Sequence, residues 1–285
     1  MRLNPFNTGS IDVRRGGGGG GFPGGGGGQL GCGAIAIALI GALVFGIDPG
    51  QMLGTMQGMQ QDAPVQQQGQ GTATAEEICG ESAYATEACN ALASLNQTWE
   101  PIFRQAGIPF SQPHLTLYTG GTNSGCGSAS SAMGPFYCPA ENGIYLDTSF
   151  YDLMERQMGA GGDFARYYVM AHEYGHHIQT LTGISNQIRS AQQQNPRQAN
   201  QLQVLMELQA DCYAGVWAGK NRNLIEPGDF EEGMTAASAI GDDTLSGGRA
   251  SPETFTHGTS QQRMQALRLG METGDDTQCD RIMQG

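Results

Sequence analysis

Apolar residues change their spacing along the chain, and each spacing predicts a different element. Residues 1–29 are polar, basic and then glycine-rich, with too few apolar side chains to build a core, so we expect a disordered leader. Residues 30–47 (LGCGAIAIALIGALVFGI) carry no charge. As a helix they would span about 27 Å, close to the roughly 30 Å apolar thickness of a bilayer. This stretch predicts a transmembrane anchor.

The flanking charges orient this predicted anchor. Three arginines precede it and Asp48 follows it, which favours a cytoplasmic N-terminus and a periplasmic or extracellular remainder at the inner membrane. A cleaved signal peptide is disfavoured because FGIDPGQML contains no small-x-small site. A lipoprotein anchor on Cys32 is disfavoured because the apolar run follows that cysteine instead of preceding it.

Beyond the anchor the composition changes twice. Residues 48–75 are rich in Gln, Gly and Met and predict a flexible linker, whereas residues 76–285 have a globular composition and suffice for one domain. The segments PHLTLYTG and GIYLDTSFY alternate like strands. We expect Ile144 to Asp147 to form an edge strand that lines a substrate cleft and pairs with extended peptide.

Two long helices are predicted in the second half of this domain. One runs from Phe164 to about Thr182, with Asp163 as its N-cap, and the other from about Arg197 to Ala218. Strands and helices together predict an α+β domain, with a small sheet and one transmembrane helix in front of it.

Charge and cysteine content further narrow the class of protein. The net charge of −13, with Lys220 as the single lysine, opposes nucleic-acid binding. Six cysteines follow the predicted anchor without any C-x-x-C pair, which disfavours a zinc finger and favours disulfides in an oxidising compartment; buried free thiols are the alternative. Spacing favours two local bridges and leaves a third by elimination, namely Cys79–Cys89, Cys126–Cys138 and Cys212–Cys279.

The first predicted helix contains H-E-x-x-H. Residues four apart share a helix face, so His172 and His176 can bind one zinc ion together. Glu173 lies about 100° around the helix and can act as general base on a water molecule that the zinc activates. His177 lies off the ligand face and is interpreted as a flanking polar residue.

The second predicted helix supplies a third ligand. In MELQADCYAGVW, Glu207 and Asp211 are also four apart. Catalytic zinc commonly takes two histidines and one glutamate, so Glu207 is the predicted ligand. Asp211 is then placed to accept the N–H of a ligand histidine. A solvated face is the simpler alternative, but the apolar neighbours of both carboxylates argue against it.

These motifs resemble the gluzincin-type zinc peptidases. HEYGHHIQ, ELQADCYAGVW and FTHGTSQQR, together with the glycine-rich leader, FGIDPG and the CGSASSAMGPFYCP segment, are similar to the bacterial neutral zinc metallopeptidase family over nearly the whole chain. The resemblance implies a zincin-like fold, one catalytic zinc on His172, His176 and Glu207, Glu173 as the base, and cleavage of peptide bonds. It also suggests His257 as an oxyanion donor; the alternative is a loop histidine that caps the next helix.

The remaining candidates are assigned to the scaffold. Tyr174 and Tyr213 are expected to be packing residues, and His114 a strand-edge or surface residue. The leading hypothesis is thus a membrane-anchored zinc metallopeptidase acting on a polypeptide substrate, with no nucleic-acid partner. A non-hydrolytic membrane scaffold with structural zinc, or an amidase acting on cell-wall peptides, remains the alternative.

Overall fold

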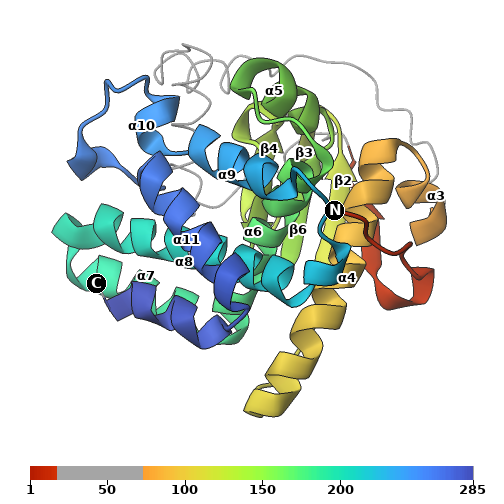
Figure 1. Ribbon diagram of the computed structural model, residues 1–285, viewed down its shortest axis with the longest axis horizontal. Coiled ribbons are helices and arrows are strands. Elements are labelled where there is room, and N and C mark those ends of the chain that lie inside the picture. The colour runs from red at the N-terminus through yellow and green to blue at the C-terminus, as the bar shows by residue number, and fades with distance from the viewer. Residues whose placement is uncertain (18–72, 285) are drawn as a thin grey trace, which may run out of the picture.

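The computed structural model describes residues 1–17 and 73–284 (Figure 1). Its larger sheet has the strand order β1-β2-β6-β5, in which β1, β2 and β6 run parallel and β5 runs antiparallel to β6. The four strands are β1 (Asp12–Arg15), β2 (His114–Tyr118), β6 (Gly143–Asp147) and β5 (Phe136–Cys138). A separate hairpin consists of β3 (Gly121–Ser124) and β4 (Gly127–Ser130).

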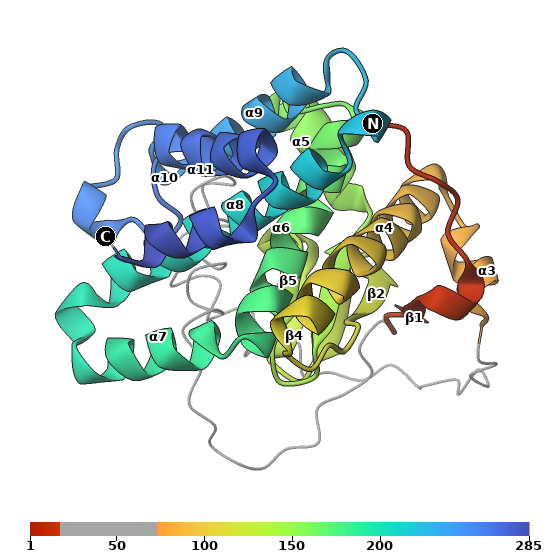
Figure 2. The same ribbon diagram turned by 60° about the horizontal axis from the view of Figure 1, so that its bottom comes forward.

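Helices cover one face of this sheet in successive layers. The four long helices are α4 (Ala83–Ala106), α6 (Asp163–Leu181), α8 (Ala199–Lys220) and α11 (Ser260–Thr273). The shorter ones are α3 (Ala75–Cys79), α5 (Ser149–Met158), α7 (Ile184–Gln194), α9 (Asp229–Ala239), α10 (Asp242–Leu245) and the 3₁₀ segment η6 (Asp276–Gln284). Helices α4 and α6 lie against the sheet, α8 packs on α6, and α11 covers α8 (Figure 2).

Local sequence explains where the helices begin and end. Thr74 and Glu77 form a capping box at α3, and Thr259 and Gln262 form another at α11. Helix α4 ends at Gly107, whose φ of 70° is a left-handed conformation that glycine adopts without steric cost. These signals lie in the residues next to each terminus, which makes such boundaries accessible to sequence reasoning.

The fold class differs from the prediction. The described residues form a mixed α/β fold that is mainly helical, and most strands of the larger sheet are parallel, so the predicted α+β class with a leading transmembrane helix is wrong. Parallel strands need crossover connections, and the long helix α4 stands between β1 and β2 in the chain. Strand β6 is also not an edge strand, because β2 and β5 flank it; β5 is the edge strand that contacts α6.

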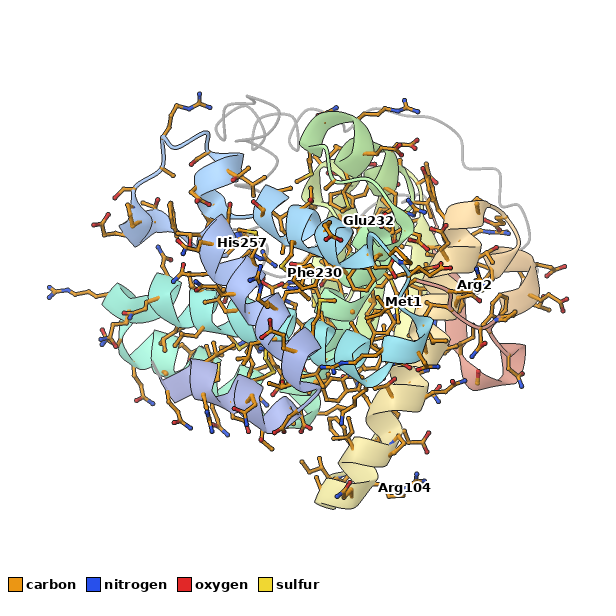
Figure 3. All side chains as sticks on the ribbon, in the orientation of Figure 1. Met1, Arg2, Arg104, Phe230, Glu232 and His257 are labelled. Carbon is orange, nitrogen blue, oxygen red and sulfur yellow. A yellow bond between two sulfur atoms is a disulfide. The ribbon has the colours of Figure 1, made fainter. Side chains whose placement is uncertain are left out.

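The leader is part of the folded unit as far as the structure describes it. Val13 in β1 is buried, β1 pairs with β2 from Asp12↔His114 onward, and Met1 is buried beside α6 and α9 (Figure 3). The expected disorder is therefore wrong for residues 1–17. Strand β1 contains a single buried residue, so its stability comes from its partner strand and not from its own apolar content.

The predicted membrane topology needs correction as well. Among residues 1–17 and 73–284, no helix combines the length and apolar character of a membrane span; the predicted anchor, residues 30–47, lies outside the described residues. A single crossing at 30–47 would put β1 and β2 on opposite sides of a membrane. Since both strands belong to one sheet, the predicted inner-membrane location with a cytoplasmic N-terminus is wrong.

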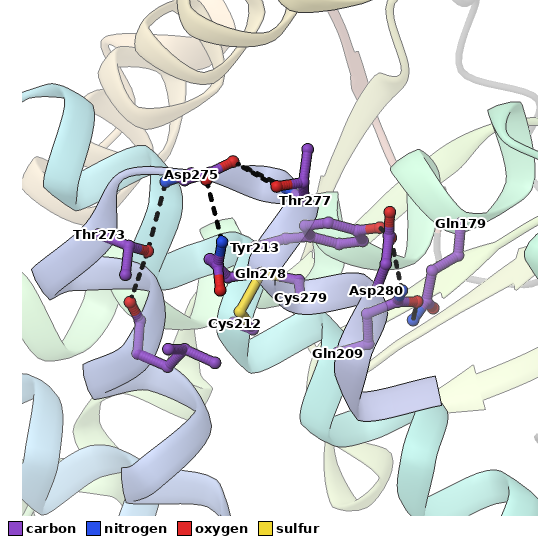
Figure 4. Close-up of a disulfide and its surroundings, with 11 residues drawn as sticks. Gln179, Gln209, Cys212, Tyr213, Thr273, Asp275, Thr277, Gln278, Cys279 and Asp280 are labelled. Carbon is purple, nitrogen blue, oxygen red and sulfur yellow. Dashed lines mark hydrogen bonds between the residues drawn. A yellow bond between two sulfur atoms is a disulfide. The ribbon is translucent and has the colours of Figure 1, made fainter. Parts of the chain in front are cut away.

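The disulfide pairing predicted from spacing is confirmed. Sulfur–sulfur bonds join Cys79 to Cys89, Cys126 to Cys138 and Cys212 to Cys279. The last of these ties the C-terminal segment η6 to α8, so a residue near the end of the chain is fixed against one of the two long helices that the sequence singles out (Figure 4).

Candidate metal centre

The two motif helices pack closely because small residues meet between them. Gly175, inside H-E-x-x-H on α6, has no side chain, and a Cβ added there would stand only 2.8 Å from the Cα of Ala210 on α8. Ala210 itself lies between Glu207 and Asp211. Each motif thus contributes the small residue that lets its own polar side chains reach the other helix.

Three side chains converge across this contact. His172 Nε2 lies 3.1 Å and His176 Nε2 lies 3.6 Å from the same carboxylate oxygen, Oε2 of Glu207. All three ligand atoms lie within 4.8 Å of one another, and His172 and Glu207 are buried. The other carboxylate oxygen of Glu207 accepts a hydrogen bond from Gln203 at 2.9 Å.

This arrangement fits a zinc ion. Ligand atoms about 2.0–2.1 Å from a tetrahedral zinc are about 3.3–3.4 Å apart, and the two separations found here fall on either side of that value. Two imidazoles and one carboxylate are donors that zinc commonly takes when a fourth position is left for water. Within the described residues, the group contains three protein ligands and no fourth.

A buried ion pair stands behind His172. Asp211 Oδ1 accepts from His172 Nδ1 at 2.8 Å and from the hydroxyl of Tyr168 at 2.6 Å. Both oxygens of Asp211 also accept from the guanidinium of Arg263, each at 2.8 Å. Asp211 and Arg263 are 0% and 1% exposed, and burying such charges is tolerable only because they are paired in this two-point geometry.

The carboxylates create a field that favours positive charge at the two histidines. Burial lowers the pKa of His172, but Asp211 and Glu207 outweigh that effect and raise it to about 9. The pKa of His176 is raised in the same sense, against burial, chiefly by Glu207. Burial opposes ionisation of Glu207, yet His176 and His172 hold its pKa well below the usual value. A proton or a metal cation can satisfy this field.

Glu173 differs from the other carboxylates at the site. It is 8% exposed, and among the described residues its carboxylate makes no hydrogen bond. Burial raises its pKa, and Glu207 adds to this, while the two histidines act in the opposite direction. An unpaired carboxylate with a raised pKa next to a metal site has the properties of a proton acceptor.

His257 lies in the loop before α11 (Figure 3). Its Nδ1 is 3.2 Å from Asp242 Oδ1, and Asp242 Oδ2 accepts from the backbone N–H groups of Thr256, His257 and Gly258. This loop contacts α8, because Gly258 packs near Val204 and Leu208, and the charge of His257 is among those that lower the pKa of Glu207.

The other predicted positions fall on the scaffold. Tyr174 donates to Asn96 and Tyr213 stacks edge-on against Trp99, so both pack in the core. His177, interpreted from the sequence as a flanking polar residue, is 0% exposed, and its Nε2 lies 2.7 Å from the carbonyl oxygen of Ser111. His114 is 4% exposed at the start of β2, a strand flanked on both sides, so the expectation of a surface or strand-edge position is wrong.

Fold and site together define a mixed α/β protein in which H-E-x-x-H and a glutamate from a second helix form a candidate metal site. Comparison with known families extends this: the model of the family described as "Putative neutral zinc metallopeptidase" matches residues 4–282. The chain therefore belongs to this family, as the resemblance of its motifs indicates, and membership implies zinc as the metal.

Curated relatives carry the similarity without adding a function. "Uncharacterized protein YpfJ" of Escherichia coli is 47% identical over 251 residues, covering 86% of this chain and 85% of its own length. "Uncharacterized protein Rv2575" of Mycobacterium tuberculosis is 41% identical over 204 residues, covering 66% of this chain and 67% of its own length. No solved structure matches the chain.

Sequence reasoning missed several residues around the metal centre, although a signal for them exists. Tyr168, His172, His176 and Gln179 follow one another at intervals of four, four and three on α6. A second stripe on α8 has Gln203 at four residues before Glu207 and Asp211 four after it. Extending the helical period beyond the motif residues would have found Tyr168, Gln179 and Gln203. Arg263 comes from a distant helix and belongs to neither stripe; its only signal is its place at the end of the segment FTHGTSQQR.

Proposed function

We propose that this chain is a zinc-dependent peptidase in which His172, His176 and Glu207 hold the metal and Glu173 is the general base. One observation carries the proposal: three ligand atoms converge at separations that suit zinc, beside the buried carboxylate of Glu173, which hydrogen-bonds to no described residue. When bound, zinc would polarise the scissile carbonyl and make a water molecule more acidic.

Glu173 moves the proton in this scheme. Its carboxylate accepts a proton from the attacking water and returns it to the nitrogen of the departing amine, so it ends the cycle ionised. Burial supports this role, because it raises the pKa of Glu173 and so makes its carboxylate a stronger base. The polypeptide substrate is part of the proposal and follows from the family name.

His257 supplies positive character where the carbonyl oxygen becomes negative. Asp242 accepts from Nδ1 of His257 and from three backbone N–H groups of the same loop, which orients the imidazole ring. When the ring is protonated on both nitrogens, its Nε2–H is left to donate to the oxyanion. We assign His257 to oxyanion stabilisation and Asp242 to positioning His257.

A purely structural zinc is the less favoured alternative. Structural zinc sites usually have four protein ligands, whereas the group in the described residues has three. His257 does not provide the fourth through Nδ1, because that atom faces Asp242.

The decisive experiment compares the zinc-loaded full chain with its Glu173→Gln variant on a fluorescently labelled unfolded protein. We expect zinc content to stay at one ion per chain while the cleavage rate falls by about 10²–10⁴-fold, since only the proton acceptor is removed. Cleavage of the same substrate at the wild-type rate by Glu173→Gln would refute the assignment.

Two further experiments test the role of His257 and the class of substrate. His257→Ala should retain zinc and lose about 10²–10³-fold in kcat, the usual effect of removing an oxyanion donor; loss of zinc instead would make His257 a ligand. The same assay is also run with cell-wall peptide fragments as the substrate. Turnover of those fragments with none of the unfolded protein would replace the polypeptide substrate by a wall peptide.

A further inference from the structure

Gln179 lies at the end of α6, three residues beyond His176, and is 0% exposed. Its amide group makes three short contacts. Oε1 lies 2.9 Å from His176 Nδ1, while Nε2 lies 2.8 Å from the carbonyl oxygen of Met206 and 3.0 Å from Oε1 of Gln209. A glutamine amide has one acceptor oxygen and two N–H donors, so both N–H groups and the oxygen are used.

The carbonyl of Met206 determines which way this amide faces. A carbonyl oxygen can only accept, so the NH₂ group of Gln179 must point at Met206 and its oxygen must point at His176. That oxygen in turn can only accept, which requires the proton of a neutral His176 to be on Nδ1. The lone pair of His176 is then on Nε2, the atom that faces Glu207.

Gln209 supports this orientation from α8. It is 0% exposed, and its oxygen accepts the second N–H of Gln179, which leaves its own NH₂ group directed toward Asp280 Oδ1 at 3.5 Å. Asp280 follows Cys279, whose disulfide to Cys212 fixes this part of η6 on α8 (Figure 4). Hydrogen-bond donation thus runs in one direction, from His176 through Gln179 and Gln209 to Asp280, and the shortest contacts are those made by Gln179.

We propose that Gln179 is a positioning residue for the metal centre: it holds His176 in the tautomer and ring orientation that present Nε2 to the metal. The inference rests on the zinc site of the proposed function. Asp211 positions His172 in the same way, through a carboxylate whose charge Arg263 balances. Among the described residues no guanidinium forms a hydrogen bond with Gln179, so a neutral amide is the partner that fits there.

The test measures zinc affinity of the full chain by competition with a chromophoric chelator. Gln179→Met keeps the length of the side chain but removes the acceptor, and we expect zinc affinity to fall about 10- to 100-fold, the usual effect of losing such a partner. Gln179→Glu keeps an oxygen facing His176 and should bind zinc within about threefold of wild type. Gln187→Met, at an exposed position on α7, is the matched control and should change nothing.

Stability of the zinc-free protein separates positioning from packing. A buried carboxylate facing the Met206 carbonyl is unfavourable, so Gln179→Glu should melt at a lower temperature than Gln179→Met when zinc is absent. The expected order of zinc affinity is the reverse of this order of stability. If affinity follows stability instead, Gln179 has only a structural role and the proposal is overturned.

Two more readouts complete the design. The visible absorption spectrum of the Co²⁺-substituted protein should change in Gln179→Met and not in Gln187→Met, because the ligand geometry at His176 changes only in the former. Gln209→Met removes the acceptor for one N–H of Gln179 but leaves the contact between Gln179 and His176, so it should lose less zinc affinity than Gln179→Met. An equal or larger loss would contradict the direct role given to Gln179. Absence of zinc binding by wild type would refute the proposed function itself, whereas zinc binding that is equal in all variants refutes only this inference.

Discussion

Three histidines stand within six residues of α6, and their surroundings give them different charges. Carboxylates outweigh burial at His172 and raise its pKa to about 9, whereas burial alone dominates at His177 and lowers its pKa to about 4. His177 Nε2 donates to the Ser111 carbonyl, so its Nδ1 accepts from the hydroxyl of Tyr137, at 3.0 Å. His177 is therefore a neutral bridge from α6 to the edge strand β5 and to the loop before β2.

His177 makes folding stability depend on acidity. The unfolded chain binds a proton at this histidine below about pH 6.5, but the folded protein does so only below about pH 4. Between these values the unfolded state holds more protons, so the free energy of unfolding falls as pH is lowered, by up to roughly 3 kcal/mol in total.

The prediction is that His177→Gln, whose amide can still donate to Ser111, flattens the pH dependence of zinc-free stability between pH 6.5 and 4. Denaturant unfolding at several pH values measures it. The wild type and the variant should differ by a constant amount above about pH 7.5. Curves that stay parallel down to pH 4 would show that His177 is not a buried neutral group.

At the level of elements, the distance between α6 and α8 controls whether a metal site exists. His172 and His176 come from one helix and Glu207 from the other, so a small separation of the helices would move Glu207 Oε2 out of reach. The contact at Gly175 and Ala210 leaves no space for an additional methyl group.

We predict that Gly175→Ala weakens zinc binding even though alanine favours a helix. Alanine favours a helix by about 1 kcal/mol over glycine, but here its Cβ would stand 2.8 Å from Ala210 Cα and 2.9 Å from the Ala210 carbonyl oxygen. The helices must separate, so zinc affinity should fall by at least about tenfold, measured by chelator competition.

Gly17→Ala serves as the control, since an added Cβ there meets no atom within 4 Å. It should leave zinc binding unchanged. Wild-type zinc affinity in Gly175→Ala would mean that the close contact does not set the position of Glu207.

Sequence reasoning succeeded where the signal is local. The two long helices and their polar faces follow from residues three and four apart, and the structure brings His172, His176 and Glu207 within reach of one another. It failed where stability comes from distant partners. The segment DVRR has one buried residue and becomes a strand only because β2 lies beside it, and Arg263 becomes part of the site only through α11.

At the level of the whole molecule, residues 1–17 complete a domain whose remaining described part begins at residue 73. Removing them would uncover the outer edge of β2, whose five residues are all buried in the intact protein. Exposed strand edges with apolar side chains promote association with other chains.

We therefore predict that a fragment of residues 73–285 is less stable than the full chain and tends to aggregate. A synthetic peptide of residues 1–17 added to this fragment should raise its melting temperature, and a scrambled peptide should not. Light scattering and thermal unfolding measure both effects. A fragment as stable and monodisperse as the full chain would contradict a structural role for the N-terminal segment.

The pairing of β1 with β2 also has a consequence for the time course of synthesis. Asp12 pairs with His114, 114 − 12 = 102 residues later. At typical translation rates of about 5–20 residues per second, β1 leaves the ribosome about 5–20 s before its partner strand exists. The first strand of the sheet must therefore stay unpaired and unaggregated while the chain up to its partner strand is made.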